Sequence, residues 1–333
     1  MIHASAPGRC GLVGNPTDMY GGSVISCSTQ ERARCSLTPD ANALTVTVSG
    51  QSLVLRSTDD LTLRSGDYFN VVRAALSALE INPFTAKPFQ LTAETDIPMQ
   101  AGLAGSTAIL AAIVGCLLTH LELCLNTYET AEVMRQIEYN TLGIVCGFQD
   151  HYMTVFGGLN YMDFRDKNSA ETQTADTPFA TIEPLTEFVS ELPLVLAHTG
   201  IRHHSGSVHA SPRERWLHGD SEVVSGYGEI GKLARRGKRA LLACDWERLA
   251  DLMNRNHAIV RDLGGSGEAN ETLIAAALAN GALGAKLAGA GGGGTILALT
   301  HDRERTIAAL KSAGAESIML PQPQPGLTVE IRV

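Results

Sequence analysis

The most constraining feature of the sequence is a glycine-rich stretch, residues 96–108, that joins a short extended segment to a long apolar run. The extended segment ends at Pro98, and apolar residues at helical spacing fill residues 108–118. Gly102 and Gly105 let the backbone approach a ligand closely and adopt positive φ angles. Because the first N–H groups of a helix are unpaired and carry partial positive charge, we predict an anion site here, with phosphate as the favoured anion.

The same stretch has a second interpretation. Ser106 and Thr107 supply hydroxyls that can meet a phosphate or its Mg²⁺. Glycine and serine are also favoured at the start of a buried helix for local reasons, so a plain N-cap stays open. No Gly-Lys-Ser/Thr sequence follows the glycines, which excludes a Walker A loop.

Length and charge narrow the class of protein. A chain of 333 residues predicts two domains, or one large one. The net charge is -9 and no basic block occurs, so nucleic acid is not an expected partner. The hydrophobic content of 44% is enough for a full core.

The cysteines and the apolar runs predict the compartment. The seven cysteines are odd in number and form no Cys-x-x-Cys pair, which favours a reduced, cytoplasmic protein. The first residues have neither a basic region nor a long apolar region, so no signal peptide is expected. The longest apolar run is shorter than the ~20 residues of a membrane span, so no membrane partner is expected.

Apolar periodicity predicts the order of elements. Strands are expected at residues 1–14, 23–37, 43–55, 89–94, 192–197, 295–299 and 327–333. Helices are expected at residues 67–80, 106–120, 127–141, 213–236, 239–257, 268–280 and 302–313. The polar run 165–184 reads as a loop and places a domain boundary near residue 185.

Three glycine-marked sites, residues 7–18, 98–108 and 284–294, follow one another along the chain. Together they resemble the three motifs of the GHMP kinase superfamily, over nearly the whole chain. Within that superfamily the glucuronokinases are the closest match. Their first motif, phosphate loop and catalytic segment resemble residues 11–22, 102–106, 143–150 and 157–164. Bacterial heptose 7-phosphate kinases share the Gln149–Asp150 pair, so they are the near alternative.

The resemblance implies an α+β fold of two domains. A ribosomal protein S5 domain 2-like, ATP-binding domain would span residues 1–185, and a ferredoxin-like domain residues 186–333, with the active site in the cleft between them. It further implies ATP and Mg²⁺ as cofactors and phosphorylation of an anomeric sugar hydroxyl. Glucuronate, giving glucuronate 1-phosphate, is the first candidate substrate. The expected assembly is a monomer or homodimer.

The resemblance also carries roles onto individual residues. Asp150 matches the general base and Arg9 its basic partner. Glu138 and Ser106 match the Mg²⁺ ligands. The implied ATP-phosphate residues are Pro98, Gln100, Ala101, Gly102, Leu103, Ala104, Gly105, Ser106 and Thr107. The implied substrate-binding residues are Asn15, Asp18, Gly22, Gln149, Arg202, Gly291 and Gly292, of which Asp18 would accept hydrogen bonds from sugar hydroxyls.

Each assignment has a structural alternative. Asp150 can be a solvated charge or a cap, and Glu138 a helix-face charge. Arg9 can be a surface turn residue, and Asp18 an Asx-turn former. The glycine run that ends at residue 294 can be a tight turn. Because consecutive glycines cost backbone entropy on folding, a role in close approach to a ligand is the favoured interpretation. Lys286, beside it, is expected to be a surface charge.

The loop near residue 200 is rich in histidine: His198, His203, His204 and His209. A zinc site there is not favoured, because adjacent histidines cannot easily face one ion and no thiolate pair joins them. We expect a substrate loop in which Arg202, His203 or Arg213 faces an anionic sugar. Residues 199–202 resemble the heptose kinase pattern more than the plant glucuronokinase pattern, which leaves the sugar open.

Two other function classes remain possible on the sequence. One is a member of the fold that senses a sugar without catalysis, although Asp150, Glu138 and Ser106 are all present. The other is a decarboxylase of the isoprenoid branch. The Asn-Pro-Thr-Asp segment at residues 15–18 and the Gln149–Asp150 pair argue against it.

Overall fold

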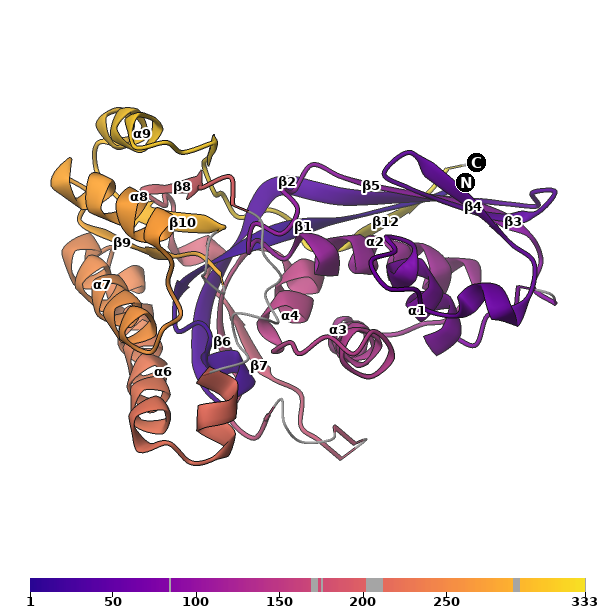
Figure 1. Cartoon of the computed structure of the whole chain (residues 1–333), viewed down its shortest axis with the longest axis horizontal. Helices are drawn as coiled ribbons and strands as arrows, with labels where there is room; N and C mark the ends of the chain where they lie inside the picture. Colours follow the sequence, from indigo (N-terminus) through magenta and orange to yellow (C-terminus); the bar gives the residue numbers. More distant parts are fainter. Residues whose placement is uncertain (84, 169–172, 175, 202–211, 290–293, 333) are drawn as a thin grey trace.

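The computed structural model describes residues 1–332 except 84, 169–172, 175, 202–211 and 290–293. Within these residues eight strands form one sheet and four form a second. Figure 1 shows the second sheet and its helices on the left and most of the first sheet, with its own helices, on the right. This arrangement is the α+β architecture expected from the sequence.

Two long strands organise the first sheet. β1 (Ile2–Val13) and β2 (Ser23–Pro39) pair antiparallel, and the strand order is β12-β1-β2-β5-β3-β4, with β6 and β7 branching from β2. The other members are β3 (Leu44–Val48), β4 (Gln51–Leu55), β5 (Phe89–Thr95), β6 (Leu159–Asp163), β7 (Thr181–Pro184) and β12 (Thr328–Ile331). The glycine-rich loop follows β5, so the sheet delivers it to one end of β1.

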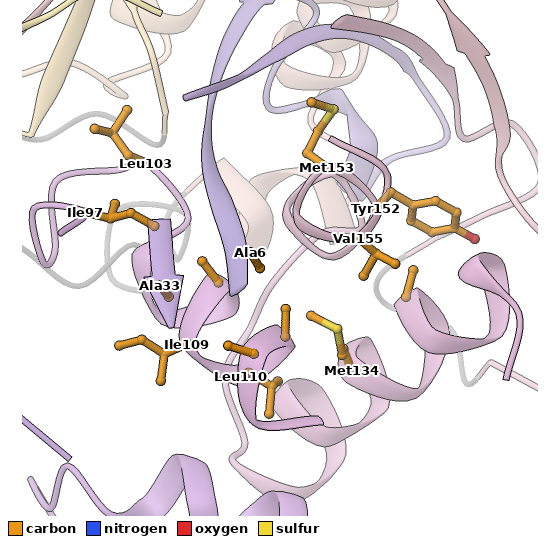
Figure 2. Close-up of a cluster of buried hydrophobic side chains, with 14 of the residues drawn as sticks. Ala6, Ala33, Ile97, Leu103, Ile109, Leu110, Met134, Tyr152, Met153 and Val155 are labelled. Carbon is orange, nitrogen blue, oxygen red and sulfur yellow. The ribbon is translucent and has the colours of Figure 1, made fainter. Parts of the chain in front are cut away.

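Four helices cover one face of this sheet (Figure 1). They are α1 (Asn70–Ala78), α2 (Gly105–His120), α3 (Thr127–Gln136) and α4 (Gln149–Phe156). α2 is apolar nearly all round and buried along most of its length, as expected of a helix packed on every side. Figure 2 shows the core here, where Leu110 of α2 lies near Ala6 of β1 and Met134 of α3, and Ile109 lies near Ala33 of β2. This packing fixes the N-terminus of α2 relative to β1.

The second sheet is antiparallel, with strand order β11-β8-β10-β9. Its strands are β8 (Leu194–His198), β9 (Gly284–Leu287), β10 (Thr295–Leu299) and β11 (Ser317–Met319). The helices of this region are α6 (Ser221–Leu242), α7 (Trp246–Asp262), α8 (Glu268–Ala279) and α9 (Arg303–Ser312). α8 and α9 share an apolar cluster with β8 and β10, whereas α6 packs on β2 and α7 on β9. α6 and α7 therefore connect the two sheets.

Residues 212–217 are also helical, and a turn at 218–219 separates them from α6, so the helix expected at 213–236 is interrupted. Short helical turns complete the described chain. They are η1 (Thr17–Met19), η2 (Thr58–Leu61), η4 (Thr186–Phe188) and a π-helical turn, η3 (Ile137–Thr141). The helix expected at residues 127–141 thus changes to π geometry after Gln136. π turns occur often at functional sites, and this one carries Glu138.

Several expectations need correction. The run 165–184, expected to be a loop, contains β7, and the strands β6, β9 and β11 and the helix α4 were not expected. The break expected at residues 236–239 does not occur, because α6 runs through it. Gly237 lies at the expected break, and a glycine inside a helix costs ~1 kcal/mol. The burial of Leu233, Ala240 and Leu241 of α6 outweighs that cost.

The end of the chain departs from the expected 186–333 domain. Residue 185, where the boundary is predicted, lies between β7 and β8, which belong to different sheets. β12, however, returns to the first sheet and pairs with β1, with Ile331 opposite Ile2. β12 covers what would otherwise be an open edge of β1. No helix among the described residues is both long and apolar enough to cross a membrane.

Candidate active site

A cavity of about 460 Å³ lies where the three glycine-marked stretches meet. Its walls come from the end of β1, the loop before α2, the segment before α4, and Gly289. The predicted site residues that line it are Arg9, Asn15, Asp18, Gln100, Ala101, Gly102, Leu103, Ala104, Gly105, Ser106, Thr107, Glu138, Gln149 and Asp150. Most of the predicted site is therefore brought to one place.

The loop before α2 is held open by unusual backbone geometry. Gln100, Gly102 and Ala104 all have positive φ, of 58°, 72° and 60°. For Ala104, the N-cap residue, this left-handed conformation costs roughly 1–2 kcal/mol. No side chain caps the helix, so the N–H groups at the start of α2 remain available beside the cavity. The arrangement suits an anion such as a phosphate.

Backbone contacts tie the three stretches together. The N–H of Arg9 donates to the carbonyl of Leu103 at 3.1 Å, and the N–H of Gly11 donates to the carbonyl of Ala288 at 2.9 Å. A Cβ at Gly289 would overlap the carbonyl oxygen of Gly102. Only glycine therefore permits the third stretch to approach the phosphate-type loop this closely.

Arg9 joins the glycine-rich loop to Asp150. Its Nε and Nη2 lie 2.7 and 2.6 Å from Oδ1 of Asp150, and its Nη1 donates to the carbonyl of Gly102 at 2.7 Å. The arginine side chain is 8% exposed and the aspartate side chain 31%. A carboxylate in the first turn of α4 is thus fixed against a cation while part of it still faces the cavity.

Glu138 is held on both oxygens. Thr107 donates from Oγ1 to Oε1 at 3.0 Å, and Nε2 of His151 lies 2.9 Å from Oε2. Glu138 is only 4% exposed, yet it lines the cavity. Ser106, the other predicted Mg²⁺ ligand, is exposed on the same cavity wall. These oxygen donors are the kind that Mg²⁺ prefers, so the residues present fit that ion.

Asp18 organises the start of α4. Its Oδ2 accepts from the N–H groups of Phe148 and Gln149, at 2.9 and 3.0 Å. Burial raises the pKa of this carboxyl to about 6, and the two backbone donors oppose that rise. A Cβ at Gly147 would overlap the same oxygen, so a glycine is required there. Asp18 therefore caps a helix from a distant part of the chain as well as lining the cavity.

Lys286 is a buried residue of β9, which corrects the expectation of a surface charge. Its Nζ donates to Oδ1 of Asn15 at 2.8 Å and to the carbonyl of Gly11 at 3.1 Å. Burial lowers the pKa of this amine to about 7, and the nearby Arg9 guanidinium acts in the same direction. Asn15 in turn donates from Nδ2 to the carbonyl of Gly289 at 3.2 Å.

The remaining predicted site residues either do not line the cavity or fall outside the described residues. Gly22 packs its backbone in a turn with Thr17, and neither it nor Pro98 lines the cavity. Arg202, Gly291 and Gly292 lie outside the described residues, as do His203, His204 and His209. His198 is buried in β8, with Nδ1 3.0 Å from the carbonyl of Gly294.

Sequence reasoning missed two residues near the site, His151 and Cys146, and one contact of a predicted residue, Thr107. Thr107 was assigned to the phosphate loop, but its hydroxyl also holds Glu138. His151 was passed over although it follows Asp150 directly, and Cys146 was quoted only as part of a motif. A histidine next to a candidate base is a signal that the sequence alone offered, but its burial and its partner are visible only in the structure.

Comparison with known proteins identifies the family. The model "GHMP kinases N terminal domain" matches residues 70–158, and "GHMP kinases C terminal" matches residues 238–316. The probable glucuronokinase 2 of Arabidopsis thaliana is 33% identical over 304 residues, which cover 85% of this chain and 81% of the plant protein. The chain belongs to the GHMP kinase family. It is a small-molecule kinase, and ATP is the phosphoryl donor expected of that family.

Other GHMP kinases match over similar lengths. The D-glycero-alpha-D-manno-heptose 7-phosphate kinase of Campylobacter jejuni is 28% identical, over 88% of this chain and 87% of its own length. The crystal structure of a D-glycero-D-manno-heptose 1-phosphate kinase from Bacteriodes thetaiotaomicron superposes with a TM-score of 0.77 and 21% identity, covering 100% of both chains. The GHMP kinase fold expected from the motifs is confirmed.

Proposed function

We propose that this GHMP kinase transfers the γ-phosphoryl group of ATP to the anomeric hydroxyl of a sugar acid, with glucuronate as the first candidate and glucuronate 1-phosphate as product. The observation that carries the proposal is the contact of Arg9 with both Asp150 and the Gly102 carbonyl. It places a carboxylate beside the loop that suits the phosphates. An acceptor hydroxyl between the two would be positioned for transfer.

Asp150 is the proposed general base. Its carboxylate can accept the proton of the acceptor hydroxyl, and Arg9 holds it in one orientation. The exposed N–H groups at the start of α2 can stabilise charge on the transferring group. Phosphoryl transfer depends chiefly on such positioning and on charge stabilisation.

Ser106 and Glu138 are the residues that would hold Mg²⁺. When bound with ATP, such an ion neutralises charge on the phosphate oxygens. Thr107 and His151 fix the Glu138 carboxylate from behind, so its position does not depend on the ion alone. Gln100, Ala101, Leu103 and the other loop residues would line the path of the phosphates.

The proposed acceptor site uses the polar groups across the cavity from the loop. Asn15, Asp18 and Gln149 line this wall and offer amide and carboxylate groups to sugar hydroxyls. The choice of an acidic sugar is supported by the likeness to the plant glucuronokinase. An arginine can pair with a sugar carboxylate in bidentate fashion.

The basic loop near residue 200, which is expected to bind the acidic group of the sugar, is only partly described. Arg202 lies outside the described residues. Arg215 is committed elsewhere, since it pairs with Asp220 and Glu222 at 2.8 and 2.6 Å. Arg213 is partly buried, and its Nε has no hydrogen-bond partner among the described residues. Of the arginines expected to face the acid, Arg213 is the described one with an unpaired Nε, although it does not line the cavity.

A heptose 7-phosphate kinase is the second candidate, favoured by the likeness to the Campylobacter protein. A phosphate on the acceptor would use the same kind of arginine contact as a carboxylate. A sugar sensor without catalysis is less well supported, because Asp150, Arg9 and Glu138 are assembled around one cavity.

An ADP-release screen distinguishes these candidates. The acceptors are glucuronate, galacturonate, galactose, arabinose, heptose 7-phosphate and mevalonate, each with Mg·ATP. We expect glucuronate to give the highest kcat/KM and phosphorus NMR of its product to show an anomeric phosphate. Faster turnover of heptose 7-phosphate would select the second candidate. Turnover of neutral galactose or arabinose ahead of every acidic acceptor would contradict the acidic-sugar proposal.

A further inference from the structure

Three side chains of different chemistry converge beside the proposed Mg²⁺ site. Glu138 comes from the π turn, Cys146 from the irregular segment before α4, and His151 from α4. One ligand atom from each lies within 4.8 Å of the other two. Among the described residues, no other three His, Cys, Asp or Glu side chains converge in this way.

The cluster is enclosed but can be reached from the cavity. His151 is 0% exposed and Glu138 4%, whereas Cys146 is partly buried. Both Glu138 and Cys146 line the cavity, so an ion entering it would meet two of the three ligands directly. His151 already lies with Nε2 at 2.9 Å from Oε2 of Glu138.

The local charge favours a cation. The Cys146 thiol lies in the field of three carboxylates and one guanidinium, those of Glu138, Asp150, Asp18 and Arg135. Arg135 donates from Nε to the carbonyl of Gly147 at 3.0 Å, and its one positive charge is outnumbered by the three carboxylates. A divalent ion at the cluster would therefore gain more attraction than repulsion from its surroundings.

The donor set selects the kind of ion. One sulfur, one imidazole nitrogen and one carboxylate oxygen suit Zn²⁺, which binds such ligands at about 2.0–2.3 Å. Ligands at tetrahedral angles around one ion would then lie roughly 3.3–3.8 Å apart. The three ligand atoms now lie within 4.8 Å of one another, so Cys146, which lies outside any helix or strand, must move closer. Nε2 of His151 and Oε2 of Glu138, now hydrogen-bonded at 2.9 Å, must move apart by roughly 0.4 Å to admit the ion. Mg²⁺ would not use the sulfur, because it takes oxygen ligands.

We propose that Glu138, Cys146 and His151 form a second metal site, for a thiophilic divalent cation such as Zn²⁺, next to the Mg²⁺ site. Because Glu138 would serve both ions, and two divalent cations sharing one carboxylate repel each other, binding of one should weaken binding of the other. This competition, unlike the binding itself, rests on the proposed function. A thiophilic ion in the site would thus inhibit the kinase by withdrawing Glu138 from Mg·ATP.

Cobalt titration of the full chain, without ATP or sugar, tests the site. Co²⁺ replaces Zn²⁺ and gives a thiolate-to-cobalt absorption band when a cysteine binds it. We expect a single Co²⁺ per chain with that band, lost in Cys146→Ser and weakened at least about tenfold in affinity in His151→Gln. Cys124→Ser, at an exposed cysteine outside the cluster, is the matched control and should keep the band. Equal bands in wild type and Cys146→Ser would overturn the site.

The same titration tests the shared ligand. Adding Mg²⁺ with a non-hydrolysable ATP analogue should raise the apparent Kd for Co²⁺ and bleach the band. An unchanged Kd, with the band intact in wild type, would overturn the competition and leave the cluster itself established. Because neither measurement uses a sugar, failure of the proposed kinase substrate would not be mistaken for failure of the metal site.

Discussion

The ammonium of Lys286 lies 2.8 Å from Oδ1 of Asn15, and it joins the second sheet to the first glycine-marked stretch. The same ammonium donates to the carbonyl of Gly11 in β1, and Asn15 passes the contact on to the Gly289 carbonyl. A buried cation without a paired carboxylate is costly, so its three oxygen partners must offset that cost. Lys286 therefore holds β9 of the second sheet against the end of β1 beside the cavity.

Replacing Lys286 with methionine should change how stability depends on pH. Burial lowers the pKa of Lys286 to about 7 in the folded chain, from an ordinary 10.5. Between these values the unfolded chain binds more protons, so raising the pH through this window favours folding. Below about pH 7 both states are protonated and the cost of burying the charge is fully present. The lysine contribution is thus least favourable at low pH.

Denaturant unfolding of wild type and Lys286→Met from pH 6 to 10 measures this contribution. The free energy of unfolding of wild type minus that of the variant should rise above pH 7, by at most about 1.4 kcal/mol per pH unit. Because all other titrating groups are common to both proteins, their contributions cancel in the difference between the two free energies of unfolding. A difference that stays flat from pH 7 to 10 would mean that Lys286 does not titrate in that window.

Arg9→Lys should reduce turnover while preserving the charge. A lysine has one nitrogen and cannot contact Asp150 and the Gly102 carbonyl in the forked geometry of the arginine. Loss of one charged hydrogen bond is worth about 1.5–3 kcal/mol, which corresponds to roughly 10–100-fold in kcat if the contact is fully used in the transition state.

The matched control is Arg34→Lys. Arg34 and Asp96 form an exposed ion pair outside the cavity, so this variant should keep wild-type kinetics and stability. Steady-state kinetics and thermal melting of both variants make the comparison. Equal kcat values for the two variants would show that the fork at Arg9 does not matter for the reaction.

Much of the site was predictable because its signals are local. The loop at residues 96–108, the apolar helix that follows it and the Gln149–Asp150 pair are all short, contiguous patterns. Their relative placement came from the family resemblance, since no spacing along the chain implies that Arg9 meets Asp150. The structure places them in contact across 141 positions of sequence.

What the sequence did not predict depends on distant contacts. α4 is only 8 residues long, and the carboxylate that caps it, Asp18, lies 130 positions before Phe148. Lysine is usually found at the surface, and Lys286 is buried because of partners more than 270 positions away. β12 carries an ordinary strand pattern, but nothing local assigns it to β1. Tertiary packing decided all three cases.

Ser106→Ala and Glu138→Gln should raise the Mg²⁺ requirement far more than they lower stability. Ser106→Ala removes an oxygen ligand of the hard cation, and Glu138→Gln removes the negative charge of another. Glu138→Gln also keeps a group of the same shape for Thr107 and His151. We expect turnover at limiting Mg²⁺ to fall at least about tenfold and to recover in part at high Mg²⁺. Glu247→Gln, at an exposed glutamate, is the control. Unchanged kcat at limiting Mg²⁺ in both site variants would remove Ser106 and Glu138 from the metal site.

Asp150→Asn should cost far more in kcat than in the KM for ATP or acceptor. Asparagine keeps the shape and can hydrogen-bond the acceptor hydroxyl and Arg9, so binding should survive. It cannot accept the proton, and general bases typically contribute about 10²–10⁴-fold. The lower end is expected, because a loose phosphoryl-transfer transition state needs the base late.

Asp163→Asn is the matched control for the loss of a carboxylate at residue 150. Asp163 lies in β6, is bonded by the backbone and side chain of Arg165, and does not line the cavity. Replacing Asp163 should lower the melting temperature and leave kcat close to that of wild type. Asp163 is buried, yet Arg165 holds the pKa of its carboxyl below the usual value, so the charged form contributes to folding. Steady-state kinetics with melting curves separate the two effects. Should Asp150→Asn keep more than about a third of wild-type kcat, well above the loss expected of a general base, the base must be a different residue or the acceptor must lose its proton to the phosphate itself.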